Sequence, residues 1–443
     1  MNNSRAVIVV ENREALRVAA ASARISTQQG TALEIYDRSL GDEKDLKLLN
    51  KVLSSGHKSI IEHQTFSIAF NDVSVLVEQF VIEARLASYT VKSRRYVDFS
   101  GAGYVVPEGL DDAQRRVYDA AMAARFDDYQ KLLELVPKED ARFVLPYCLR
   151  SNFFMTVNAR ELISLICAML YGRGKDFVEV AALGRQLKEQ FDAMYPGVID
   201  AEAARYPAYE PMPMPEGIRV GTDRAGDAEL VDAPRDAEDL LGLALEFTGR
   251  FAPKAFPDVR RENLRAMLTD ARPRELEALS YTFHIKRVSL ACVTHFTRHR
   301  MVSLLVPPVA RGLADGDYVL PETVKAVPEA EAVYRHAFED QHRTTSEAKA
   351  LGFSMEALSY FALSGHEIDL MLTMNAREIV HFMKLRTCRR AQWEIRGVAW
   401  RMLDALRESC PEIFGGIGPS CVYGKCPEGR MSCGKPYKSI WEE

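Results

Sequence analysis

The feature that most limits how this chain can fold is an internal repeat. The stretch IEHQTFSIAFNDVSVLVEQFVIEARLAS in the first half parallels LEALSYTFHIKRVSLACVTHFTRHRMVS in the second half, and FMTVNAREL parallels MLTMNAREI. The internal spacing also agrees, because 26 residues separate Glu62 from Ser88 and 26 separate Glu277 from Ser303. Matching motifs at matching spacings indicate two copies of one fold in a single chain.

The repeat divides the 443 residues into four parts. We expect copy one at residues 1–205, a Pro-rich linker at 206–215, copy two at 216–409 and a Cys-rich tail at 410–443. Each copy begins with a strand followed by a helix, and extended and amphipathic stretches then alternate. We therefore predict an α/β (α+β) fold in which each copy packs a small β-sheet with long helices.

Hydrophobic periodicity predicts several elements directly. Copy one should contain a strand and a helix within 5–24, and helices at 43–54, 72–85 and 111–136. In copy two, residues 375–406 contain no proline and repeat apolar residues at three- and four-residue steps, which allows one long helix. That stretch also carries several cations, which suggests an anionic ligand at its edge. The alternative is a solvated basic face.

Composition narrows the class of protein. The net charge of −5 argues against general nucleic-acid binding, so an anion site must be local. The chain has no run of about 18 apolar residues, so we expect no membrane span. The N-terminus lacks the layout of a signal peptide, and cysteines that sit singly in apolar or helical runs suggest a reducing compartment. We therefore expect a cytoplasmic protein.

The repeated motifs resemble those of the flavin-dependent thymidylate synthases. That family carries R-H-R-x-x-S-x-N-E-x-S-x-R-Y, an upstream G-H-x-S/T-x-x-E-H segment and a downstream N-x-R helix followed by L-R and A-Q-W-E-I. The resemblance covers nearly the whole chain, with one family-length unit per half. It implies transfer of a methylene group from methylenetetrahydrofolate to dUMP, with FAD as hydride carrier, NADPH as reductant and no cysteine nucleophile. It also implies active sites between subunits of a homotetramer.

Copy one retains part of the family pattern. Its GHKSIIEH segment is intact, and by resemblance we assign its polar residues to the flavin: His57, Ser59, Glu62 and His63. By the same resemblance, the residues that would bind the nucleotide phosphate are Ser93, Arg95 and Arg142. The opening R-H has become Glu83-Ala84 and the N-E pair has become Thr90-Val91. Met169 stands where the family has its catalytic arginine.

Copy two retains largely the complementary part. By resemblance, its flavin-binding residues are Arg298, His299, Arg300, Asn375, Arg377 and His381. Arg386 takes the place of the catalytic arginine at the uracil ring, and Arg298 is also assigned to the nucleotide. The copy lacks the G-H-x-S segment, and Ser359 replaces the phosphate-binding arginine.

Each copy has therefore lost largely what the other kept. We expect composite sites between the two copies, and a homodimer that forms a pseudo-tetramer with about half the sites of a homotetramer. Both copies lack the N-E pair, which leaves open a closely related pyrimidine nucleotide as the substrate. A different class of function is a non-catalytic paralogue that binds FAD or a nucleotide, or that partners a complete family member.

The tail carries a separate signal. A Gly- and Pro-rich segment of 24 residues contains four thiols: Cys410, Cys421, Cys426 and Cys433. Such a set suggests a tetrahedral zinc site, although the spacings are not the usual C-x2-C pairs. An iron–sulfur cluster and free thiols are the alternatives. Cys388 lies near Arg386, and we interpret it as structural, since two residues apart on a helix project about 200° from each other.

Overall fold

The computed structural model describes residues 3–11, 14–210, 226–249, 261–270, 272–310, 313 and 316–438. The chain forms two compact units. Unit 1 combines 1–218 with 323–363, and unit 2 combines 219–322 with 364–443. Residues 206–210 of the expected linker are described, and the rest of that linker lies outside the described residues.

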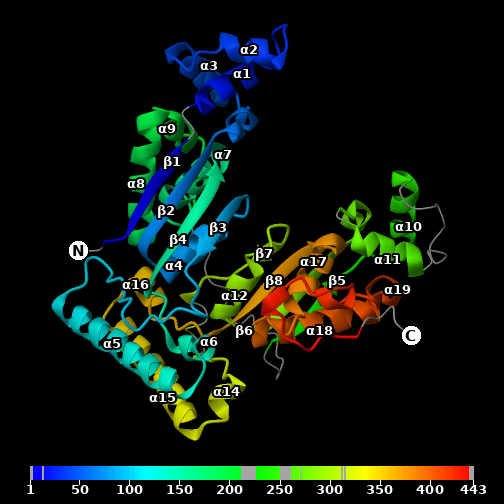
Figure 1. Ribbon diagram of the computed structural model, residues 1–443. Coiled ribbons are helices and arrows are strands. Elements are labelled where there is room, and N and C mark those ends of the chain that lie inside the picture. The colour runs from blue at the N-terminus through cyan, green and yellow to red at the C-terminus, as the bar shows by residue number, and fades with distance from the viewer. Residues whose placement is uncertain are drawn as a thin grey trace. The chain divides into compact units, whose positions relative to one another are not determined.

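Each unit is built on a four-stranded antiparallel sheet, and the strand order is the same in both (Figure 1). The order in unit 1 is β1-β2-β4-β3, with bounds Arg5–Glu11, Thr65–Ser74, Arg150–Asn158 and Ala87–Val91. The order in unit 2 is β5-β6-β8-β7, with bounds Asp227–Asp232, Ser280–Ser289, Glu367–Asn375 and Ser303–Leu305. Identical topology confirms that the chain is a tandem repeat.

The two sheets share an irregular detail at equivalent positions. β2 and β6 each shift register against their central partner, and the bulge holds Asp72 and Arg287 at φ 53° and 52°. Each backbone N–H there donates to a side chain on the neighbouring strand, Asn152 at 3.0 Å and Asp369 at 2.8 Å. Positive φ is strained for such residues, so the recurrence marks a built feature of the fold.

The helices of unit 1 cover its sheet and extend beyond it. The first-repeat helices are α1 (Ala15–Ile25), α2 (Ala32–Arg38), α3 (Glu43–Ser54), η1 (Lys58–His63), α4 (Val75–Ile82), α5 (Asp112–Leu135), α6 (Lys138–Ala141), η2 (Arg142–Val144), α7 (Ala159–Leu170), α8 (Val178–Met194) and α9 (Val198–Ala203). The core joins strand residues such as Phe66, Ile68 and Phe70 to Leu162 and Leu187. The helix predicted at 72–85 starts later, because the strand continues to Ser74, whose side chain then caps α4.

Unit 1 also contains helices from the second repeat, α15 (Pro328–Ala350) and α16 (Met355–Ser359), which follow α14 (Glu322–Lys325). α15 packs along α5 (Figure 1). Tyr118 of α5 meets the ring of Phe361 edge-on, with centroids 5.6 Å apart. The backbone N–H of Tyr147 donates to the carbonyl of Ala362 at 2.8 Å. The two repeats therefore interlock within one folded unit.

Unit 2 has the remaining helices: α10 (Ala237–Thr248), α11 (Arg261–Thr269), η3 (Arg274–Ala278), α12 (Leu290–Phe296), α17 (Ala376–Arg386), α18 (Trp393–Ser409), α19 (Pro411–Phe414), η4 (Ser420–Val422) and η5 (Gly429–Met431). The single long helix allowed over 375–406 is wrong, because the chain turns between α17 and α18. The Gln392 side chain accepts from the N–H groups of Glu394 and Ile395 and so starts a new helix. The first repeat breaks at the matching place, between α7 and α8.

Candidate functional site

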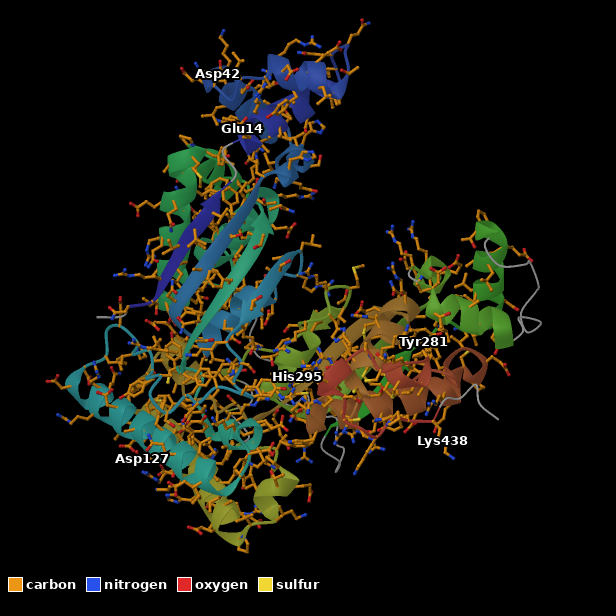
Figure 2. The ribbon with its side chains drawn as sticks, viewed as in Figure 1. Glu14, Asp42, Asp127, Tyr281, His295 and Lys438 are labelled. Atoms are coloured by element: carbon orange, nitrogen blue, oxygen red, sulfur yellow. The ribbon has the colours of Figure 1, made fainter. Side chains whose placement is uncertain are left out.

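The centre of the unit 2 site is a hydrogen-bonded group that links α17 to the segment after α12. Arg386, the last residue of α17, donates from Nε to Nε2 of His299 at 3.0 Å and from Nη2 to the carbonyl of His295 at 3.2 Å. Nδ1 of His299 lies 2.8 Å from a carboxylate oxygen of Glu378. The ring of His381 lies edge-on to that of His299, with centroids 5.5 Å apart. Figure 2 marks His295 among the side chains of this unit.

The hydrogen bonds fix the protonation state of His299. Arginine Nε always carries a proton, so Nε2 of His299 must accept, and the ring proton must lie on Nδ1 and point to Glu378. The ring is 3% exposed. Burial, together with the charges of Arg386 and His381, holds the pKa of His299 below its ordinary value of 6.5, against the opposing pull of Glu378. The imidazole is therefore neutral at pH 7.

A metal ion is an alternative use of this cluster. One ligand atom each from His299, Glu378 and His381 lies within 4.8 Å of the others. Nε2 of His299 already accepts from the guanidinium of Arg386, and Nδ1 already faces Glu378. The positive charge of Arg386 beside the ring also disfavours a cation there. We therefore interpret the cluster as a hydrogen-bonded group that orients an arginine.

Two of the predicted flavin residues in copy two, Asn375 and Arg377, form contacts that stabilise the start of α17. Asn375 caps α17 by accepting from the N–H of Glu378 at 2.9 Å, and Asn158 caps α7 in the same way. Arg377 forms an ion pair with Glu277. The matching pair in the first repeat, Arg160 with Glu62, spans 2.5 Å. These contacts hold the start of each helix against η3 or η1. The other two predicted flavin residues, Arg298 and Arg300, lie exposed on either side of His299.

The structure brings together the three residues predicted to bind the phosphate in unit 1, and Glu139 is at their centre. Arg95 donates from Nε to the Glu139 carboxylate at 2.8 Å, and Arg142 donates from Nε to the Glu139 carbonyl at 3.0 Å. The hydroxyl of Ser93 accepts from the N–H of Arg95 at 3.3 Å. Two guanidinium groups therefore converge on Glu139, where Arg95 binds the carboxylate and Arg142 binds the backbone carbonyl. Charge-assisted pairs of this kind are also how arginine binds anionic ligands.

Among the residues that the structure describes, Ser359 and Glu356 occupy the matching place in the second repeat. Ser359 is buried and donates to the carbonyl of Met355 at 2.8 Å. Glu356, at the position that matches Glu139, accepts from the N–H of Glu179 at 2.9 Å and so caps α8. The hydroxyl of Tyr360 donates to the Glu179 carboxylate at 2.6 Å. Carboxylates line this place, so it would repel a phosphate.

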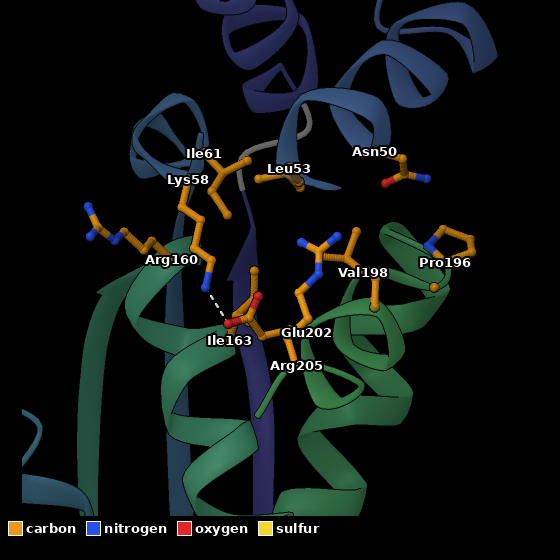
Figure 3. A pocket seen from close by; sticks show the side chains of 12 residues that line it. Asn50, Leu53, Lys58, Ile61, Arg160, Ile163, Pro196, Val198, Glu202 and Arg205 are labelled. Carbon is orange, nitrogen blue, oxygen red and sulfur yellow. Dashed lines mark hydrogen bonds and ion pairs between the residues drawn. The ribbon is translucent and has the colours of Figure 1, made fainter. Parts of the chain in front are cut away.

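The predicted flavin segment of copy one forms η1 and the residue before it. His57, Ser59, Glu62 and His63 are all exposed. Other residues of η1, Lys58 and Ile61, line a cavity of about 280 Å³ with α3, α7 and α9. Figure 3 shows Lys58 paired with Glu202 across it. The cavity is smaller than most ligand pockets, so it does not hold a whole dinucleotide.

The four tail cysteines are not gathered into one group. Cys410 is buried and donates weakly to Glu238 at 3.8 Å, whereas Cys433 donates to its neighbour Lys435 and Cys421 accepts from Tyr437. Zinc bonds of about 2.3 Å require thiolates within about 4 Å of one another. The residue cluster described above is the one metal-sized group among the residues that the structure describes. The geometry therefore gives zinc no support, and the zinc site stays a prediction.

Sequence reasoning missed two residues of these sites, Glu139 and Glu378. Both lie three residues from a predicted site residue, Glu139 before Arg142 and Glu378 after Asn375. Glu378 belongs to the repeated NARE motif, and that recurrence is the signal that would have revealed it. Cys388 lies half-buried in the turn after α17 rather than on a helix.

Comparison with known proteins agrees with the repeat. A family model described as "Thymidylate synthase complementing protein" matches residues 8–197 and again 234–412. The flavin-dependent thymidylate synthase of Geobacter sulfurreducens is 37% identical over 166 residues, which cover 36% of this chain and 70% of that protein. That of Clostridium tetani is 31% identical, covering 39% and 76%.

Two further similarities extend the comparison. The flavin-dependent thymidylate synthase of Pyrococcus abyssi is 28% identical over 225 residues, which cover 47% of this chain and 92% of that protein. Among solved structures, the UMP/dUMP methylase PolB of Streptomyces cacaoi, bound with 5-Br dUMP, is 23% identical with a TM-score of 0.40. The alignment covers 46% of this chain and 96% of PolB.

Proposed function

Because the chain belongs to the thymidylate synthase complementing protein family, we propose that it methylates dUMP at C5. It is a flavin-dependent enzyme of the methyltransferase type, as its named relatives are. Methylenetetrahydrofolate is the one-carbon donor and NADPH the reductant. FAD, when bound, supplies the hydride chemistry. One observation carries the proposal. Arg386, at the end of α17, donates to His299, which is buried and neutral.

The phosphate of dUMP binds beside Glu139, whose carboxylate now accepts from Arg95 and whose backbone carbonyl accepts from Arg142. A doubly charged phosphate offers more acceptor oxygens than Glu139, and each charge-assisted hydrogen bond contributes about 1.5–3 kcal/mol. Arg95 turns from Glu139 to the phosphate, Arg142 adds a second guanidinium, and the Ser93 hydroxyl donates.

Arg386 acts on the ring. Bond formation at C5 of uracil requires negative charge to build on the ring and its carbonyl oxygens, and a positioned guanidinium stabilises that charge. His299 accepts one N–H of Arg386 without neutralising its charge, because the imidazole is neutral. Arg386 therefore keeps its full positive charge for the pyrimidine ring.

The exposed donors around His299 suit FAD. Arg298, Arg300 and His381 are exposed beside the buried ring of His299, and the pyrophosphate of a dinucleotide needs such donors. The first repeat adds four exposed residues, His57, Ser59, Glu62 and His63. Asn375 and Arg377 complete the proposed flavin set.

The site is composite between the repeats, with phosphate-binding residues from copy one and ring- and flavin-binding residues from copy two. Three observations support this: the complementary losses of motif, the interlocking of the repeats within unit 1, and the carboxylates at the phosphate position of copy two. A homodimer then forms a pseudo-tetramer with one complete site per chain. A non-catalytic binding protein is the second candidate, favoured by the loss of the N-E pair in both copies.

The test is turnover of the purified chain. We expect yellow protein with one FAD per chain, bleaching by NADPH, and tritium release from [5-³H]dUMP only when methylenetetrahydrofolate is present. Arg386→Ala should abolish tritium release and leave the FAD content unchanged. Colourless protein, or turnover that persists in Arg386→Ala, would contradict the proposal.

A further inference from the structure

Glu378 does not bind substrate or cofactor in the proposed function, although it completes a continuous chain of hydrogen bonds. Its carboxylate lies 2.8 Å from Nδ1 of His299, and Nε2 of the same ring lies 3.0 Å from Nε of Arg386. Glu378 is 8% exposed and His299 is 3% exposed, so water does not replace these partners. The ring of Phe382 lies against the imidazole, with centroids 4.8 Å apart, and Phe296 stacks on Phe382 in turn.

The polarity of this chain of bonds depends on the carboxylate. A neutral imidazole carries one proton, and either ring nitrogen can hold it. A carboxylate is an acceptor only, so it keeps the proton on Nδ1 and leaves Nε2 as an acceptor. If the proton moved to Nε2, two N–H groups would face each other and Arg386 would be pushed out of its position.

On the basis of the function proposed above, we propose that Glu378 is a positioning residue, whose carboxylate fixes the Nδ1–H tautomer of His299 and thereby aims the guanidinium of Arg386 at the pyrimidine ring. Glu378 does not touch the nucleotide. It acts through His299, as the buried carboxylate does in a hydrolase triad.

The first repeat supplies a natural control. The positions that match His299, Glu378 and Arg386 are Ala84, Glu161 and Met169, so the carboxylate is present without its two partners. Glu161 lies in the first turn of α7 and Glu378 in the first turn of α17. The backbone N–H of each glutamate donates to the side chain of the asparagine that caps its helix. A favourable interaction with the helix dipole is common to both. Orientation of an arginine belongs to Glu378 alone.

The experiment compares Glu378→Ala, Glu378→Gln and the matched control Glu161→Ala in the full chain. For Glu378→Ala we expect kcat for tritium release to fall about 10–100-fold, the effect typical of losing a partner that orients a functional histidine. The FAD content should not change. Glu378→Gln should retain most of kcat, because its amide oxygen still accepts from Nδ1, and Glu161→Ala should match the wild type.

A double-mutant cycle on thermal unfolding tests the same link without turnover. If Glu378 and Arg386 are coupled through His299, the shift in melting temperature of Glu378→Ala/Arg386→Ala should be smaller than the sum of the two single shifts. Additive shifts, or equal kcat values for Glu378→Ala and Glu161→Ala in an active enzyme, would overturn the positioning role. Absence of wild-type turnover would instead contradict the proposed function, while the unfolding cycle would still decide the role of Glu378.

Discussion

At the scale of single residues, the affinity for dUMP should depend on the planar shape of the Arg95 side chain as well as on its charge. In Arg95→Lys the positive charge remains, but the planar fork that matches a phosphate is lost. We expect KM for dUMP to rise about tenfold, the loss of roughly one charge-assisted hydrogen bond, with little change in kcat. Steady-state kinetics checks this, with Arg115→Lys, an exposed pair with Asp119, as control. An unchanged KM in Arg95→Lys would remove Arg95 from the phosphate site.

The buried ring of His299 should give stability a pH dependence. Its pKa is lowered in the folded state, so below about pH 6.5 the unfolded chain binds a proton that the folded chain resists. The contribution of His299 to stability is therefore fully present above pH 6.5, and it is lost as the pH falls from 6.5 through the lower pKa of the folded state. We expect the wild type to lose more unfolding free energy between pH 7.5 and 5.5 than His299→Gln does. Urea titrations at the two pH values measure the difference, and equal losses would mean that the ring is not held neutral.

At the scale of elements, the pairing of α5 with α15 depends on one buried cation. Arg125 is 1% exposed, and it forms ion pairs with Asp128 and Asp340 at 2.9 and 3.1 Å. It also donates to the carbonyl of Ala337 on α15. Removing one partner of a buried pair leaves the other charge poorly compensated. Here Asp128 would keep only the exposed Lys131, at 3.7 Å.

We therefore expect Arg125→Leu to lower the unfolding free energy by about 3–5 kcal/mol. Arg335→Ala, which removes an exposed pair with Glu331 on the same helix α15, should change it by less than about 1 kcal/mol. Urea unfolding followed by circular dichroism measures both. A change of similar size in the two variants would show that the buried network does not hold the helices together.

At the scale of the whole molecule, the repeats should not be separable at the linker. A fragment of residues 1–210 lacks α15 and α16, so Tyr118 loses Phe361 and Glu179 loses the hydroxyl of Tyr360. We expect this fragment alone to lack a cooperative thermal transition. Co-expression with residues 216–443 should restore the transition, because the missing helices are supplied by the second fragment. A cooperative transition in the fragment alone would contradict the interlocked arrangement.

Among the described residues, no helix combines the length and apolar character that crossing a membrane requires.

Prediction from the sequence succeeded where a signal is local or repeated. The strand and helix expected within 5–24 are β1 and α1, and the helix expected at 111–136 is α5. The repeated motifs predicted two copies of one fold, which the common strand order confirms. The break between α17 and α18 was missed, because apolar steps of three and four residues fit two shorter helices as well as one long helix.

The sequence alone therefore determined the repeat, the fold of each copy and the kinds of side chain available for the reaction, because periodicity and motif spacing report on neighbouring residues. Only the tertiary structure decided which distant groups meet. His299 and Glu378 are 79 residues apart, and Arg125 and Asp340 are 215 apart. Such pairs form because buried polar groups must find partners once the chain packs, and that requirement acts in space rather than along the sequence.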